Sequence, residues 1–336
     1  MNTNILVSSK EKEKKRFIIG THDGIFHSDE VVACAILALF HSDDKIEIVR
    51  SKDVSFLYAK KADIVVDAGG SCYDHHQPGG NGRRENRVPY ASAGLVWRDY
   101  GEGVIYKCFE ELYSPFSSIL VDNTSKTYER SFKAIVKYID EDLIQNVDKE
   151  DNGIFVHTHI FSFIKSFLPV YDSKYDNFDE GFQLALNVTI EILKHAIYEA
   201  ISKEFTLKFV LNLTHGDGFV SDSILEIPSQ TFPWLETVCN YNADYAWPNI
   251  NCVNFVIFPY SSGGWAAQCV PPSLEKKFKQ RISFPKKWAG QTEKLPEISG
   301  VEDATFCHNG CFFARAETKE GVIALCENAI KANKGL

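Results

Sequence analysis

Short apolar segments alternate with helical patterns in the first third of the chain. Continuously apolar runs such as Ile64-Val65-Val66 are typical of strands buried on both faces of a sheet. The predicted strands are residues 16–20, 46–50 and 62–67, and the predicted helices are residues 29–41, 52–61 and 91–111. Strands separated by helices indicate an α/β fold with a parallel sheet and right-handed crossovers. Ligands of such sheets bind beyond the carboxyl ends of the strands, so the polar residues that follow each strand matter most.

The pattern changes after a long amphipathic segment at residues 180–204, which predicts a connector helix. Beyond it we expect strands at 223–227, 252–260 and 264–270, a loop-rich stretch at 283–300 and a last helix at 320–332. The predicted organisation is a mobile tail at 1–15, a catalytic domain at 16–179, the connector helix at 180–205 and a smaller α+β domain at 206–336 that binds substrate.

Composition excludes several classes of protein. Hydrophobic residues make up 44% of the 336 residues and aromatic residues 13%, enough to bury a core, so disorder throughout is excluded. The longest apolar run, residues 31–40, is too short to span a membrane, which takes about 20 residues. The net charge of −9 disfavours a wholly basic surface for duplex DNA, although it allows a basic groove. Nine scattered cysteines without a secretory signal predict reduced thiols in an intracellular protein.

The densest cluster of reactive side chains spans residues 21–30, directly after the first strand. It contains His22, His27, Asp29 and Glu30, and imidazole with carboxylate ligands suits Mn²⁺, Fe²⁺, Zn²⁺ or Co²⁺. The alternative is a helix cap, since Ser28 or Asp29 could cap the next helix and acidic residues suit its positive end. Capping accounts for Asp29 but not for two histidines in one loop.

Two further segments follow the third strand. Asp67 ends that strand before two glycines, where it could be a ligand or simply start a turn. Asp74 precedes His75 and His76, and in a strand these imidazoles would point to opposite faces, so that one could ligate a metal while the other meets substrate. Asp74 could supply the acceptor that a ligating imidazole needs. A solvated loop is the alternative for this segment.

An acidic loop at residues 146–153 adds Asp148 and Asp151, which could also form an ordinary turn. With four histidines in two short loops, these carboxylates predict two metal ions bridged by one carboxylate. Such a pair, ~3.5–4 Å apart, activates water and stabilises in-line displacement at phosphorus. This chemistry needs no serine or cysteine nucleophile. The sequence contains no Gly-rich phosphate loop or dinucleotide fingerprint, so a nucleotide cofactor is not indicated.

The order of these motifs resembles the DHH phosphoesterase superfamily, and more closely the Myg (melanocyte proliferating gene) family. The matching stretches are residues 20–30, 63–70, 73–77, 92–95, 147–154, 268–271, 284–290 and 306–310. The resemblance covers about residues 16–330. It implies a parallel-sheet DHH-type catalytic domain, a smaller C-terminal domain that holds substrate, and 3′–5′ exonuclease activity on RNA.

The resemblance also implies roles for single residues. His22, His27 and Asp67 would hold one metal, and Asp29, Asp67, His75 and Asp151 the other. We prefer Asp151 to Asp148 because Asp151-Asn152-Gly153 is similar to the Asp-Thr-Gly of related phosphoesterases; Asp148 stays the alternative ligand. His76 would lie near the scissile phosphate, so the predicted catalytic residues are Asp67, His75 and His76. Mn²⁺ is the expected metal, ahead of Mg²⁺, Co²⁺ or Zn²⁺.

The C-terminal motifs depart from the family pattern. Family members carry a Trp-Arg-Gly-Leu-Arg run and a Gly-Phe-Ile-Gly-Gly run, which read Trp-Ala-Gly-Gln-Thr at 288–292 and Cys-Phe-Phe-Ala-Arg at 311–315 here. The change removes phosphate donors, for which Arg281 and Arg315 could compensate. Arg83, Arg84 and Arg87 could form a phosphate clamp beside the histidine pair, or a solvated loop. The predicted substrate-binding residues are Arg83, Arg84, Arg281, His308, Gly310 and Arg315.

Two other groups of potential ligands are not favoured. Cys307, His308 and Cys311 lack the second ligand pair of a closed zinc site. His157 and His159 alternate in a predicted strand, where ordinary packing or solvent exposure is expected. The sequence therefore predicts a two-metal phosphodiesterase acting on RNA or short oligonucleotides, without membrane attachment. The alternatives are a hydrolase of a small phosphate compound, such as pyrophosphate or a dinucleotide, and a non-catalytic family member that binds nucleic acid or protein.

Overall fold

The computed structural model describes residues 15–113, 125–156, 159–170, 177–215, 219–221, 223–240 and 253–334. The chain divides into two compact units, Met1–Ile201 (unit 1) and Ser202–Leu336 (unit 2). All but the last residue of the predicted tail at 1–15 lies outside the described residues. No helix among the described residues is both long and apolar enough to cross a bilayer.

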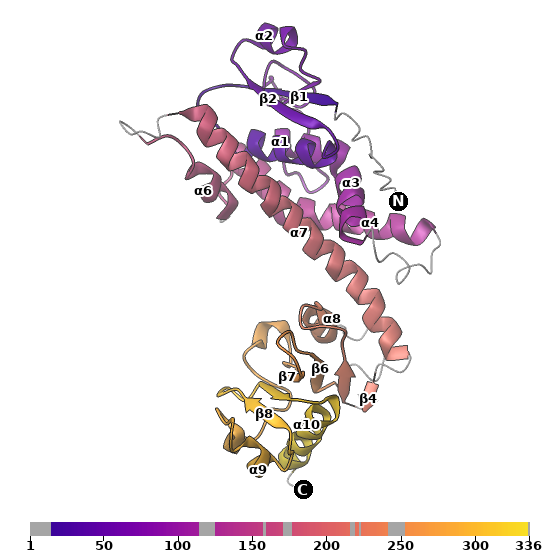
Figure 1. Ribbon diagram of the computed structural model, residues 1–336. Helices are drawn as coiled ribbons and strands as arrows, with labels where there is room; N and C mark the ends of the chain where they lie inside the picture. Colours follow the sequence, from indigo (N-terminus) through magenta and orange to yellow (C-terminus); the bar gives the residue numbers. More distant parts are fainter. Residues whose placement is uncertain are drawn as a thin grey trace, which may run out of the picture. The chain divides into compact units, whose positions relative to one another are not determined.

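Unit 1 contains a three-stranded parallel sheet, and the predicted α/β fold is confirmed (Figure 1). The strands are β1 (Arg16–Thr21), β2 (Lys45–Arg50) and β3 (Ile64–Val65), in the order β2-β1-β3. Helices α1 (Ser28–Phe40) and α2 (Val54–Ala59) form the crossovers. Because β1 and β3 run parallel, the residues that follow them lie at the same edge of the sheet.

The apolar segment at 31–40 forms most of α1, which is buried on nearly every side. Every residue from Val31 to Leu37 is at most 1% exposed. Its main partner is α3 (Ser92–Tyr113), over the range predicted as a helix at 91–111. This pair of helices forms the core beside the sheet and fixes where both helix N-termini point.

The described residues of unit 1 also contain three further helices, one π-helical turn and the start of a long helix. In chain order they are α4 (Ser125–Ile139), the turn η2 (Asp140–Ile144), α5 (Gln145–Asp151), α6 (His159–Lys165) and α7 (Phe178–His215). Helix α7 is 38 residues long, so one helix crosses the boundary between the units. It covers the predicted connector at 180–205, while the functions assigned to the two flanking domains stay predictions.

Unit 2 is built on a mixed six-stranded sheet with the order β4-β5-β6-β7-β9-β8. Among the strand pairs of the described residues, only β5 and β6 are parallel. Its strands are β4 (Phe219–Ser221), β5 (Ile224–Glu226), β6 (Phe255–Pro259), β7 (Trp265–Cys269), β8 (Ala304–Cys307) and β9 (Phe313–Ala316). Its helices are α8 (Trp234–Asn240), the 3₁₀ turns η4 (Leu274–Lys276) and η5 (Lys286–Trp288), α9 (Leu295–Ser299) and α10 (Lys319–Asn333). One apolar cluster of this unit surrounds Phe255, Phe284 and Trp288.

Three expectations about local structure are wrong, and one about a loop-rich stretch is confirmed. Strand β3 stops at Val65, before the predicted end at 67, because Asp67 has φ = 52° and left-handed backbone cannot continue a strand. Residues 145–151 form α5 and not an acidic loop. The stretch 283–300 is loop-rich as expected, with the short elements η5 and α9 inside it. His159 begins helix α6 instead of lying in a strand, and His157 is outside the described residues.

Candidate metal centre

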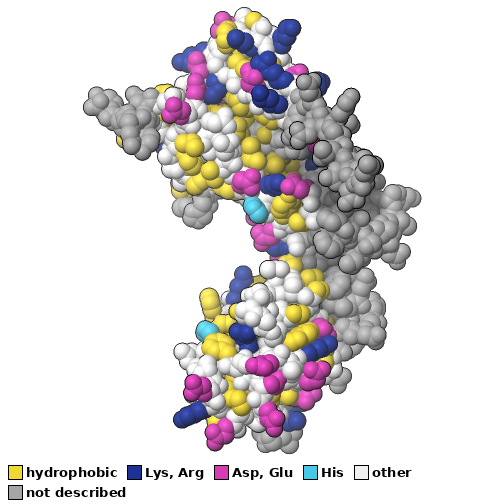
Figure 2. All heavy atoms as spheres, in the orientation of Figure 1, with side chains coloured by type: hydrophobic (Ala, Val, Ile, Leu, Met, Phe, Trp, Pro, Cys, Tyr) yellow, Lys and Arg dark blue, Asp and Glu magenta, His cyan; other side chains and the backbone are white. Residues whose placement is uncertain are grey.

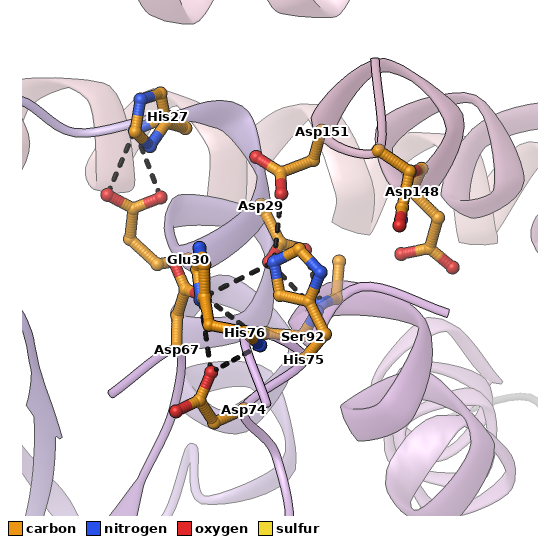
Figure 3. A network of polar contacts seen from close by, with 12 residues as sticks. His27, Asp29, Glu30, Asp67, Asp74, His75, His76, Ser92, Asp148 and Asp151 are labelled. Carbon is orange, nitrogen blue, oxygen red and sulfur yellow. Dashed lines mark hydrogen bonds and ion pairs between the residues drawn. The ribbon is translucent and has the colours of Figure 1, made fainter. Parts of the chain in front are cut away.

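The acidic and imidazole side chains predicted from the sequence gather in unit 1 (Figure 3). His22 follows β1, and Asp29 and Glu30 lie in the first turn of α1. Asp67 follows β3, and Asp151 ends α5. The parallel sheet thus brings together residues that are far apart in the sequence.

The first group comprises His22, His27 and Glu30, whose donor atoms lie within 4.8 Å of one another. The Glu30 carboxylate lies 3.0 Å from His22 Nε2 and accepts hydrogen bonds from the backbone N–H of His27 at 2.9 and 3.0 Å. Glu30 therefore orders the start of α1 and faces a histidine at the same time. The side chain is fully buried, which is costly for a carboxylate without a cation nearby.

Asp67 lies at the centre of the site, and its two oxygens face different histidines. Oδ2 lies 3.4 Å from His22 Nε2. Oδ1 lies 3.5 Å from His75 Nε2 and 3.1 Å from His76 Nδ1, and it accepts a hydrogen bond from the Ser92 hydroxyl at 3.2 Å. The left-handed backbone turns this buried side chain toward the interior of the cluster, and such strained positions concentrate at functional sites.

His75 and His76 leave the sheet in an irregular turn, and not in a strand as predicted. Their imidazoles do not point to opposite faces, since the ring centroids are 4.3 Å apart and both rings approach Asp67. Asp74 explains the turn, because it accepts hydrogen bonds from the backbone N–H groups of Gly70 and His76 at 2.7 and 2.9 Å. It also lies 3.0 Å from His76 Nδ1, so the acceptor role expected of Asp74 applies to His76.

Asp29 is held by the N-terminus of α3. Its two oxygens accept hydrogen bonds from the backbone N–H groups of Ser92 and Ala93, at 2.8 and 2.6 Å. These amide groups have no partner inside their own helix, and the helix dipole favours an anion there. The second donor group consists of Asp29, His75 and Asp151, and the third of Asp67, His75 and His76.

Asp151 and Asp148 have different surroundings although both lie on α5. Asp151 Oδ2 lies 2.9 Å from His75 Nε2, inside the cluster. Asp148 instead accepts hydrogen bonds from Arg84 Nη1 at 2.6 Å and from the backbone N–H of Gly94 at 2.9 Å. A side chain at Gly94 would overlap the Asp148 carboxylate, so glycine permits this close approach. Asp151 therefore lies in a group of potential ligands and Asp148 does not, while the choice of Asp151 as the ligand stays a prediction.

The electrostatics of the cluster fit a divalent cation. Burial and the charges of Asp67, Asp151 and Asp148 raise the pKa of Asp29 well above its usual value. Burial lowers the pKa of His22, but hydrogen bonds to Asp67 and Glu30 outweigh this and raise it to about 10. His75 Nε2 is buried beside three carboxylates yet forms no hydrogen bond within the described part of the chain. An unsatisfied imidazole nitrogen among carboxylate oxygens is a donor set that Mn²⁺, Zn²⁺ or Co²⁺ would complete.

The predicted substrate-binding residues differ in their exposure to solvent and in the unit to which they belong. Arg83 is exposed. The Arg84 side chain is only 7% exposed, because it pairs with Asp148 and with both oxygens of Asp140. Arg84 therefore stabilises α5 and η2 beside the centre, and its contact with substrate stays a prediction.

The other four of these residues belong to unit 2. Arg281 donates from Nη1 to the Val253 carbonyl at 2.8 Å, and Arg315 stacks on Tyr260 and donates to the Gly263 carbonyl at 2.9 Å. His308 and Gly310 are exposed, and His308 Nδ1 accepts from the Gly310 amide at 3.0 Å. No group of potential metal ligands among the described residues contains Cys307, His308 or Cys311.

Two contributors to the centre are not evident from the sequence pattern. Glu30 belongs to the reactive cluster at residues 21–30, but it is assigned to neither metal, although its spacing of three from His27 is that of a capping box. The backbone of Ser92 and Ala93 has no predicted role. Three small residues in succession, Ser92-Ala93-Gly94, before a helical pattern are a signal that could have indicated a helix N-terminus open to an anion.

Comparison with known proteins agrees with the motifs. The family model MYG1_exonuc, described as "Uncharacterised protein family (UPF0160)", matches residues 18–330. The MYG1 protein of Chlamydia pneumoniae is 28% identical, over 93% of this chain and 95% of its own length. The MYG1 exonuclease of Rattus norvegicus is 27% identical, over 91% of this chain and 82% of its own.

Among solved structures, RecJ of Thermus thermophilus in complex with Mn²⁺ aligns at 11% identity with a TM-score of 0.24, an overlap too low to establish a common fold. The alignment covers 96% of this chain, which spans about half (52%) of the RecJ chain. The family match, in contrast, covers nearly the whole sequence and every motif around the metal centre. The chain belongs to the MYG1_exonuc family.

Proposed function

We propose that this protein is a metal-dependent phosphodiesterase that shortens RNA or short oligonucleotides from the 3′ end. The observation that carries the proposal is the position of Asp67, with one oxygen toward His22 and the other toward His75 and His76. A carboxylate shared between two cation sites is typical of two-metal enzymes that cleave phosphate esters. The relatives named MYG1 exonuclease support the same class of reaction.

His22, His27, Glu30 and Asp67 would hold one divalent ion, and Asp29, Asp67, His75 and Asp151 the second. When bound, the ions would supply an activated water and offset the charge that develops on the phosphate. We expect Mn²⁺ ahead of Mg²⁺, Co²⁺ or Zn²⁺, since imidazole and carboxylate ligands are mixed in both sets. The α3 N-terminus orients Asp29 and favours its ionised form, because both of its oxygens accept backbone hydrogen bonds.

His76 is the residue best placed to meet the phosphate. Its Nδ1 lies between Asp67 and Asp74, while 63% of its side chain is exposed. With Nδ1 directed at two carboxylates, a second proton on Nε2 could be donated to a phosphate or leaving-group oxygen. Arg83 is one of two exposed arginines of the neighbouring loop, with Arg87, and it is the predicted contact for the next phosphate.

The test uses an RNA 20-mer labelled at either the 5′ or the 3′ end, with Mn²⁺ or with EDTA. We expect a metal-dependent ladder from the 3′ end, and none in Asp67→Asn. The matched control is Asp142→Asn, which removes an exposed carboxylate from η2 and should cleave normally. Cleavage that persists in Asp67→Asn, or that occurs in EDTA, would contradict the proposal.

A small phosphate compound is the second candidate substrate. The observation that favours it is the engagement of Arg281 and Arg315 with protein carbonyls, which leaves fewer donors for a long strand. Initial rates on a dinucleotide, on pyrophosphate and on the 20-mer separate the two. A non-catalytic role would be indicated if the protein bound RNA without binding Mn²⁺ and hydrolysed none of these compounds.

A further inference from the structure

Unit 2 presents an aromatic side chain to solvent in the middle of a basic turn. The basic turn is defined here as residues 274–281, which read Leu-Glu-Lys-Lys-Phe-Lys-Gln-Arg. Phe278 is 98% exposed, and Lys276, Lys277 and Lys279 around it are exposed as well. By contrast, Phe255, Phe258, Phe284 and Trp288 of the same unit are at most 2% exposed. Leaving a phenylalanine in water forgoes about 1.5–3 kcal/mol of burial, so its position calls for a reason.

Both ends of the basic turn are tied to the fold. At the start, Leu274 packs against the buried cluster that contains Val238 and Val270. At the end, the Arg281 amide donates to the Val270 carbonyl at 2.8 Å. Within the turn, the Lys279 amide donates to the Lys276 carbonyl at 2.9 Å. The turn is therefore anchored at its base while the tip carries Phe278.

The charge around Phe278 is opposite to that of the chain. The whole chain has a net charge of −9, yet residues 275–287 contain six Lys or Arg and one acidic residue, Glu275. Within the described part of the molecule, no ion pair involves Lys276, Lys277 or Lys279. A local cluster of unpaired cations in an acidic protein indicates a surface for a polyanion. Figure 2 shows basic and hydrophobic side chains close together on the surface of the lower unit.

We infer that the basic turn binds single-stranded nucleic acid, with Phe278 stacked on a base and the lysines on flanking phosphates. Stacking platforms flanked by cations are how proteins bind single strands without reading their sequence. The inference deepens the proposed function and rests on it for the identity of the strand as the substrate. It assigns strand binding to a segment that contains only one of the predicted substrate-binding residues, Arg281. The guanidinium of Arg281 donates a hydrogen bond to a backbone carbonyl.

A lipid surface could also attract an aromatic side chain among lysines. Peripheral membrane segments, however, are amphipathic helices that insert a whole apolar face. Here the helical part, η4, has three residues, and one aromatic side chain stands at the tip. The structure favours a base as the occupant, and vesicle binding becomes an outcome of the test.

The first experiment measures the Kd of a fluorescent single-stranded RNA 20-mer by anisotropy with the full chain. Titrations are done in EDTA, and with Mn²⁺ in the Asp67→Asn background, so that the strand stays intact. We expect Phe278→Ala to raise Kd at least about fivefold and Phe278→Trp to restore binding, because indole also stacks. Phe56→Ala is the matched control, since it removes another exposed phenylalanine (42%) from α2 in unit 1.

The second experiment separates stacking from charge. Replacing Lys276, Lys277 and Lys279 by alanine should flatten the slope of log Kd against log salt by about 0.7 for each phosphate that the lysines no longer neutralise. Phe278→Ala should weaken binding without changing that slope. Lys331→Ala with Lys334→Ala, two exposed lysines near the end of α10, is the control for total charge.

The outcomes also distinguish the inference from the proposed function. Normal cleavage of the 20-mer with unchanged Kd and KM in Phe278→Ala would overturn the inference and leave the function intact. Binding that depends on Phe278 in a protein that hydrolyses nothing would support the inference and reject the function. In a nuclease, Phe278→Ala should raise KM for the 20-mer and leave dinucleotide hydrolysis unchanged. If Phe278→Ala weakened binding to phosphatidylserine vesicles but did not change RNA binding, the inference of a nucleic-acid site would also be overturned.

Discussion

At the scale of single residues, Asp67 combines three properties that rarely occur together. It is buried, it has a left-handed backbone, and its carboxylate faces three histidines. The position of Asp67 at the end of an apolar strand allows a ligand or the start of a turn, and the family resemblance implies the ligand. The sequence does not reveal this backbone conformation, since aspartate can adopt right-handed or left-handed backbone angles and the surrounding packing selects one of them.

Asp67→Asn is the substitution that tests the carboxylate alone. Asparagine tolerates left-handed backbone, whereas alanine there costs about 1–2 kcal/mol, so Asp67→Ala mixes two effects. We expect Asp67→Asn to lower phosphodiesterase activity at least about 100-fold and to weaken Mn²⁺ binding, with little change in the free energy of unfolding of the metal-free protein. Calorimetric titration with Mn²⁺ and urea unfolding in EDTA check both parts. Unchanged Mn²⁺ affinity would contradict a bridging role.

Arg84 offers a second test, because it neutralises the buried Asp148 carboxylate. Burial raises the pKa of Asp148 to about 6, although Arg84 acts in the opposite direction. Arg84→Gln should destabilise the protein by about 3–5 kcal/mol, since it leaves Asp148 without its charged partner. Adding Asp148→Asn should recover a large part of that stability. Urea unfolding of the unsubstituted protein, the two single variants and the double variant measures the coupling free energy between Arg84 and Asp148.

The control for this comparison is an arginine–aspartate ion pair that is exposed to solvent. Arg98 pairs with Asp99 at 2.8 Å, and both side chains are more than a third exposed. Exposed pairs contribute about 0–1 kcal/mol, so Arg98→Gln should have little effect. If Arg84→Gln were equally mild, the Arg84–Asp148 pair would not be the contact that stabilises α5.

At the scale of elements, the site depends on helix and strand ends. Asp29 starts α1 and is bound by the N-terminus of α3, while His22 and Asp67 follow parallel strands. The sheet, α1 and α3 are predictable because their apolar patterns are long and regular. Helix α5 is not, since its Asp148 pairs with Arg84, which is distant in the sequence. The turn with His75 and His76 is not either, since it depends on hydrogen bonds of the polar Asp74 side chain to nearby backbone N–H groups, which an apolar pattern does not reveal.

Helix α1 should carry much of the stability of unit 1. Leu37 is fully buried in it, whereas Leu184 on α7 is 56% exposed. We expect Leu37→Ala to lower the free energy of unfolding by about 2–5 kcal/mol, because apolar burial is reduced and a cavity remains. Leu184→Ala, the matched control, should change it by less than about 0.5 kcal/mol. Similar values for the two, from urea unfolding followed by circular dichroism, would contradict the packing described for α1.

At the scale of the whole molecule, every proposed metal ligand belongs to unit 1, and the basic turn belongs to unit 2. The sequence predicts two parts joined by a helix from a change in pattern near residue 205. It does not reveal strands β8 and β9 of unit 2, which are four residues each and contain Thr305 and Arg315 between small and aromatic residues. Such short segments acquire strand structure only by pairing with neighbours.

Metal binding should therefore stabilise one unit selectively. A ligand that binds only the folded state adds RT ln(1 + [L]/Kd), about 2.7 kcal/mol at 100 times Kd. We expect Mn²⁺ to slow hydrogen–deuterium exchange in peptides from β1, α1 and α5, and to leave peptides from β6, β7 and α10 unchanged. Asp67→Asn should abolish the effect, whereas uniform protection of both units would argue against a centre confined to unit 1.

The division into units has a further consequence for how the protein is made. Ligands numbered 22 to 151 all leave the ribosome before any residue of unit 2, and domains generally fold in that order during synthesis. The nascent chain can thus meet cellular cations while its C-terminal part is still being translated. Which ion the finished protein carries then depends on the pool of free metal present at the time of translation as well as on relative affinity.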